Sequence, residues 1–122
     1  MKLLWATIRA RSLEESIAFY REAAGLKLLR RFPAGPGIEI AFLGNGEEGE
    51  TLVELISGGS SGAPAIGDSV SLGFAVGSLE EAMASMAAKG IPLHGEPVET
   101  PSARFFCVKD PNGLSVQFFQ AK

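Results

Sequence analysis

The sequence is poor in cysteine, histidine and tryptophan, with one of each among its 122 residues. The single thiol, Cys107, cannot form an internal disulfide, so the composition favours a reducing compartment and we expect a cytoplasmic protein. The single histidine, His94, lies in a segment of weak strand character. We expect it to have a partly exposed structural role.

The sequence also lacks an excess of positive charge and a long apolar run. Its 11 basic and 14 acidic side chains give a net charge of −3, and nucleic-acid binding requires a basic surface. The longest uncharged run, residues 55–67, is shorter than the roughly 20 residues that span a bilayer. The apolar start is interrupted by Arg9 and Arg11, so it does not resemble a signal peptide. We therefore expect neither a nucleic acid nor a membrane as partner.

The chain contains an internal duplication. Three motifs recur at offsets of 65 to 67 residues: Ser12-Leu-Glu-Glu15 with Ser78-Leu-Glu-Glu81, Gly25 with Gly90, and Asn45-Gly46 with Asn112-Gly113. A chain of this length fits one domain. We predict a single domain with a first module at 1–57, a linker at 58–67 and a second module at 68–122.

Each module is predicted to contain a strand, a helix and three further strands, which gives an α+β fold. In the first module the strands are 2–10, 26–32, 38–43 and 51–56, and the helix runs from a capping box at Ser12 to Gly25. In the second module the strands are 69–76, a weak edge strand at 91–97, and a hairpin formed by 105–109 and 115–120, with a helix at 79–89.

Two segments between these elements have turn or linker composition. Asp110-Pro-Asn-Gly113 predicts a hairpin turn in which Asn and Gly supply the positive-φ positions. Residues 57–67 are rich in Gly and Ser, which is typical of a flexible connector. The alternative is a mobile flap near a ligand cavity.

The alternation of side chains predicts which residues lie on the face of each sheet away from the helix. Strands 2–10 and 51–56 direct Trp5, Arg9 and Glu54 to that face. On the equivalent face of the second module we expect the small or polar residues Ser71, Gly73, Ser115 and Gln117. Phe119 is expected on the same face.

The sequence resembles the vicinal oxygen chelate superfamily in its two modules and in three motifs. These motifs are Leu13-Glu-Glu-Ser-Ile-Ala-Phe-Tyr20, Val53-Glu-Leu55 and Asp110-Pro-Asn-Gly113. It includes glyoxalase I, bleomycin- and fosfomycin-resistance proteins and extradiol dioxygenases, and the likeness covers nearly the whole chain. Within the superfamily, the length of the modules and the segment Leu26-Lys-Leu-Leu-Arg30 most resemble those of bacterial glyoxalase I. The resemblance implies two βαβββ modules that form a curved, half-open barrel, completed in a homodimer.

The resemblance also implies a divalent metal site at the barrel floor, at positions Trp5, Glu54, Ser71 and Gln117. Glyoxalase I would have His, Glu, His and Glu there. Indole offers no usable lone pair, and hydroxyl and amide groups are weak ligands, so these residues do not suit a nickel or zinc ion. We therefore expect no metal or other cofactor; a divalent metal held in an altered way is the alternative.

We hypothesise that Trp5, Glu54 and Gln117 line a small apolar cavity, with Ser71 and Gly73 providing room. The alternative is that these residues only fill the barrel as core. A carboxylate beside a tryptophan loses hydration, which would suit Glu54 to general-base work, and it could accept hydrogen bonds from Gln117 or pair with Arg9.

Arg9 matches an arginine that, in glyoxalase I, helps bind a carboxylate of glutathione. It could equally be a solvated surface residue. We expect metal-independent binding of a small aromatic or acidic molecule; the alternative is a glyoxalase I-like lyase, or a related isomerase or dioxygenase, that uses Glu54. A structural dimer without a ligand is a third possibility.

Overall fold

A computed structural model describes residues 1–47, 50–59 and 65–122, and its chain divides into two compact units, Met1–Ala65 and Ile66–Lys122. The first unit contains β1 (Ala6–Arg9), α1 (Leu13–Ala24), β2 (Lys27–Pro33), β3 (Ile38–Gly44) and β4 (Val53–Gly58). The second contains β5 (Ser71–Ala75), α2 (Leu79–Ala88), β6 (Val98–Glu99), β7 (Ala103–Lys109) and β8 (Ser115–Ala121).

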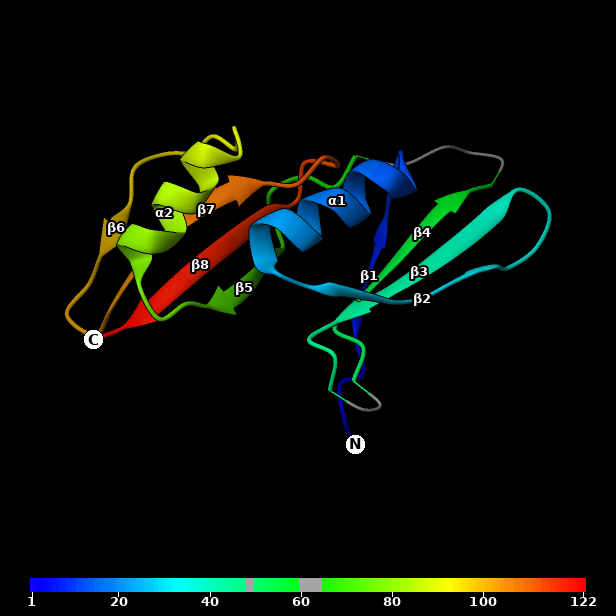
Figure 1. The fold of residues 1–122 in the computed structure, drawn as a ribbon, viewed down its shortest axis with the longest axis horizontal. Helices are drawn as coiled ribbons and strands as arrows, with labels where there is room; N and C mark the ends of the chain where they lie inside the picture. Colours follow the sequence, from blue (N-terminus) through cyan, green and yellow to red (C-terminus); the bar gives the residue numbers. More distant parts are fainter. Residues whose placement is uncertain (48–49, 60–64) are drawn as a thin grey trace. The chain divides into compact units, whose positions relative to one another are not determined.

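The two units have the same topology. Their four-stranded sheets have the orders β1-β4-β3-β2 and β5-β8-β7-β6, so in each unit the last strand lies between the first strand and the third (Figure 1). The first and last strands pair in parallel, and the other pairs are antiparallel. The predicted α+β class and the two βαβββ modules are confirmed. Within the described residues, no helix is long and apolar enough to cross a membrane.

The predicted helix caps are confirmed. The Ser12 side chain accepts a hydrogen bond from the backbone N–H of Glu15 at 3.2 Å, and Ser78 does the same for Glu81 in the second unit. Gly25 ends α1 with φ of 66°, in the left-handed region that favours glycine. The repeated Ser-Leu-Glu-Glu motif therefore starts both helices through the same local contact.

Burial alternates along β4 and β8, as the sequence predicts. In β4, Val53 and Leu55 are buried while Glu54 is half-buried; in β8, Val116 and Phe118 are buried on either side of the half-buried Gln117. Helix α1 contacts β2, β3 and β4, and α2 contacts β8. The buried strand residues pack with the helix, and we call the other side of each sheet its open face.

The predicted edge strand at 91–97 is wrong. This segment contains no strand in the structure, and β6 is limited to Val98 and Glu99. Pro92 and Pro97 have no N–H for a ladder, and Gly95 has a φ of 83°. The backbone N–H of His94 still donates to the carbonyl of Cys107 at 2.7 Å, which ties the segment to β7.

The turn after β7 differs in detail from the prediction. Gly113 has a φ of 89°, but no described residue other than glycine has a positive φ, so Asn112 does not supply one. Instead, the buried Asp110 accepts hydrogen bonds from the backbone N–H groups of Asn112 at 2.8 Å and Leu114 at 2.9 Å. Of the proposed connector or flap at 57–67, residues 60–64 lie outside the described part of the chain.

An ion-pair network joins α1 to the sheet of the first unit. The guanidinium of Arg31 in β2 contacts Glu39 in β3, with Nε 2.7 Å from Oε2, and also pairs with Glu14 in α1. Hydrogen bonds from Arg31 hold the pKa values of Glu14 and Glu39 below their ordinary value of 4.5. The carboxylates in turn raise the pKa of Arg31.

This network predicts a pH-dependent contribution to stability. Because both carboxyl pKa values are lowered in the folded state, the contribution is complete above the unfolded value of 4.5 and is lost as the pH falls through the folded values. Arg31→Met should therefore lower the free energy of unfolding in urea at about pH 6 and have a smaller effect at about pH 3. Arg21→Met is the control, and an Arg31→Met effect that is constant over this range would contradict the prediction.

Candidate ligand-binding site

The open face of the first sheet surrounds Glu54 with residues from both neighbouring strands. Parallel pairing sets Thr7 of β1 beside Glu54, and antiparallel pairing sets Phe42 of β3 on its other side. The hydroxyl of Thr7 donates a hydrogen bond to Oε1 of Glu54 at 2.6 Å. The half-buried carboxylate is thus held in place through one of its oxygens.

Aromatic side chains continue across the same face. The ring of Trp5, half-buried just before β1, lies 5.2 Å from that of Phe42 at an interplanar angle of 37°. Phe42 in turn makes an edge contact with Phe32 of β2 at 5.4 Å. The guanidinium of Arg30 covers Phe32 at 4.4 Å. We call Trp5, Phe42 and Phe32 the aromatic strip.

Arg9 does not supply the hydrogen bond to Glu54. It is exposed and lies opposite Ile56, two cross-strand rows beyond the row that contains Thr7 and Glu54. The donor to Oε1 is Thr7. The hypothesis that Glu54 pairs with Arg9 is therefore not supported by the contacts of the first unit.

The second sheet carries the equivalent positions on its own open face. Gly73 of β5 lies opposite Gln117 of β8, and a Cβ on Gly73 would stand 3.5 Å from the Gln117 side-chain oxygen, an ordinary contact distance. Ser71 is exposed opposite Ser115, and the half-buried Cys107 lies opposite Gln117 on β7. Small residues thus leave the Gln117 amide accessible.

These donor groups do not fit a nickel or zinc ion. At the expected metal positions the first unit offers one carboxylate, Glu54, whose Oε1 already accepts from Thr7, and the Trp5 indole, which packs on Phe42. The second offers a hydroxyl and an amide, which are weak ligands. Among the residues that the structure describes, no group of three His, Cys, Asp or Glu side chains is arranged to hold a metal.

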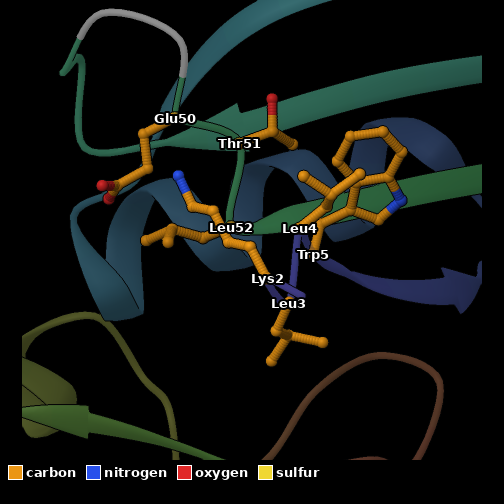
Figure 2. A pocket seen from close by; sticks show the side chains of 7 residues that line it. All are labelled: Lys2, Leu3, Leu4, Trp5, Glu50, Thr51 and Leu52. Atoms are coloured by element: carbon orange, nitrogen blue, oxygen red, sulfur yellow. The ribbon is translucent and has the colours of Figure 1, made fainter.

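A hollow of about 200 Å³ adjoins Trp5 at the N-terminal end of the first unit. Figure 2 shows Trp5 and Thr51 at one end of it and Lys2 and Glu50 toward the other. Its lining is completed by Leu3, Leu4 and Leu52. Because ligand pockets usually measure about 300–1,000 Å³, this hollow is too small to be the whole of a binding site.

Sequence reasoning missed two residues of this site, Thr7 and Phe42. Alternation already directs Thr7 to the face of Trp5 and Glu54, but only the register of β1 on β4 shows that its hydroxyl reaches the carboxylate. Phe42 lies in a strand of apolar residues, and its contact with Trp5 depends on the order of the strands.

The sequence matches the family described as Glyoxalase/Bleomycin resistance protein/Dioxygenase superfamily over residues 2–118. It is 34% identical over 116 residues to the Bacillus subtilis protein YwbC, described as uncharacterized, covering 93% of this chain and 92% of that protein. It is 30% identical over 128 residues to the lactoylglutathione lyase of Neisseria meningitidis, covering 100% of this chain and 92% of the lyase.

Solved glyoxalase I structures share the fold. The trypanothione-dependent enzyme of Leishmania major is 28% identical with a TM-score of 0.75, covering 98% of this chain and 86% of that enzyme. A Zea mays glyoxalase I mutant is 27% identical with a TM-score of 0.84, covering 97% of this chain and 44% of the maize chain. The chain belongs to the glyoxalase, bleomycin resistance protein and dioxygenase superfamily, which confirms the resemblance.

The contact between Thr7 and Glu54 can be measured by a double-mutant cycle. For Thr7→Val and Glu54→Met we expect a coupling free energy of about 0.5 to 1 kcal/mol in urea unfolding, low in the range for hydrogen bonds because the pair is partly exposed. The same cycle with Arg9→Met in place of Thr7→Val should give a smaller coupling. Equal couplings would contradict the assignment of Thr7 as the donor.

Proposed function

We propose that the protein binds a small aromatic molecule on the open face of the first sheet, without a resident metal ion. The observation that carries this proposal is a half-buried carboxylate, held by Thr7, next to the paired rings of Trp5 and Phe42. Rings give a planar ligand a stacking surface, and a few polar groups fix its orientation.

The other proposed contacts have more limited roles. Ser71, Gly73 and Gln117 hold the equivalent positions of the second unit and stay proposed ligand contacts. Arg9, exposed on the Trp5 face, is proposed to reach an acidic substituent at the far end of a ligand. Glu54 is a candidate general base through Oε2, because Oε1 accepts from Thr7.

A second candidate is a lyase of the glyoxalase I kind. It is favoured by the 30% identity to enzymes described as lactoylglutathione lyases, which extends over the whole of this chain. Against it stands the donor set described above, in which Glu54 is the one carboxylate at the four expected metal positions. The two candidates differ in whether the protein holds a metal.

Elemental analysis of the purified protein separates these candidates. We expect nickel, zinc, cobalt, manganese and iron each well below one ion per chain, and no rise in melting temperature on adding zinc, because binding to the folded state alone would raise it. About one metal ion per chain that remains bound after dialysis would favour the lyase candidate and overturn the proposal of metal-independent binding.

Trp5 is the sole tryptophan, so its fluorescence reports directly on the proposed site. Aromatic molecules that bind should change this emission and raise the melting temperature of the protein. The thermal shift should be lost in Trp5→Leu and kept in Leu29→Ala, which shortens an exposed apolar side chain of the same unit. Ligands that stabilise Trp5→Leu as much as the parent protein would show that they bind elsewhere.

A further inference from the structure

We infer that the aromatic ligand is a cation, an aryl amidinium, guanidinium or ammonium group whose N–H donors bind Glu54 while its ring lies on Trp5 and Phe42. This inference rests on the proposed function and narrows it to one class of ligand. It depends on three features of the open face: the position of the rings, the hydrogen bond that the carboxylate accepts from Thr7, and the contact that Arg30 makes.

The rings and the carboxylate converge on one place. Phe42 and Glu54 are direct cross-strand partners, and directly opposite residues have Cβ atoms about 4.5–5.5 Å apart. The Trp5 ring lies 5.2 Å from Phe42 on the same face. A ligand that stacks on this pair therefore brings its substituent to the carboxylate. An aromatic face beside an anion attracts positive charge, because the ring quadrupole and the carboxylate act in the same sense.

The carboxylate selects a donor. An ionised carboxylate only accepts hydrogen bonds, and the Thr7 hydroxyl supplies one of them, to Oε1. A ligand that covers Glu54 removes water from it, and an N–H of the ligand restores the lost hydrogen bond. A benzoate-like ligand would bring a like charge to the same place instead. Thr7 acts here as a positioning residue, since it fixes Oε1 and leaves Oε2 for the ligand.

The same face already holds a guanidinium on an aromatic ring. Arg30 lies 4.4 Å from the centre of the Phe32 ring, at the end of the aromatic strip away from Trp5. An opposing charge is Arg9, which is exposed two residues beyond Thr7 on β1. Its effect on a bound cation should be weak, because exposed charges are screened by water and salt.

The experiment compares three probes of nearly equal shape: benzamidine, which is cationic, benzamide, which is neutral, and benzoate. Titrations follow Trp5 emission excited at the red edge of the indole band, at low salt. We expect benzamidine to bind about tenfold more tightly than benzamide and benzoate to bind most weakly, with the preference for benzamidine falling as salt is added.

Substitutions test whether Glu54 causes the preference for benzamidine over benzamide. Glu54→Gln should abolish the difference between benzamidine and benzamide, and Glu96→Gln, which removes the same charge from an exposed loop of the second unit, should keep it. Thr7→Val should reduce the preference and Thr7→Ser should restore it. Circular dichroism of each variant verifies folding.

Benzamide or benzoate that binds Trp5 as tightly as benzamidine would overturn the inference and leave the proposed function standing. A benzamidine preference that persists in Glu54→Gln would also overturn it. If none of the three probes changes Trp5 emission, the inference fails, and the proposed function is then judged by the wider aromatic panel alone.

Discussion

The parallel pairing of β1 with β4 is the constraint on which the candidate site depends. Parallel strands cannot be joined by a tight turn, so the helix and two further strands lie between them in the chain, and the last strand returns to the middle of the sheet. The resulting register sets Thr7 beside Glu54 and leaves their face uncovered by α1. The hydrogen bond from Thr7 to Glu54 follows from this pairing rather than from any local motif.

The second unit repeats this pairing with different side chains. Its register sets Gly73 beside Gln117, where the first unit has Thr7 beside Glu54. The backbone topology is therefore shared, whereas the chemistry at the equivalent positions differs: Glu54 lies between Thr7 and Phe42, and Gln117 lies between Gly73 and Cys107. Sequence duplication predicts the architecture of both units, and it gives no reason to expect two equivalent sites.

The sequence predicts what depends on local spacing. The caps at Ser12 and Ser78 are set within three residues, and the alternation around Glu54 and Gln117 within five, so each was predictable. The hydrogen-bond donor to Glu54 was not, because it depends on the register between strands whose paired residues, Thr7 and Glu54, are 47 positions apart in the sequence. The weak edge strand predicted at 91–97 does not form, because its two prolines and a positive-φ glycine exclude a strand.

A half-buried carboxylate needs hydrogen-bond donors or positive charge to offset its loss of hydration. Superfamily resemblance implies that Glu54 would share an ion with three other ligands, but here its neighbours are an indole, a phenyl ring and a hydroxyl. The half-buried carboxylate keeps part of its surface open to bulk water, and the Thr7 hydroxyl donates a hydrogen bond to its Oε1. A ligand that displaces this water must replace its hydrogen bonds, and the adjacent aromatic rings favour a ligand that brings positive charge as it does so. At a position where the resemblance implies a metal ligand, Trp5 thus presents a ring face for stacking and no lone pair for a metal ion.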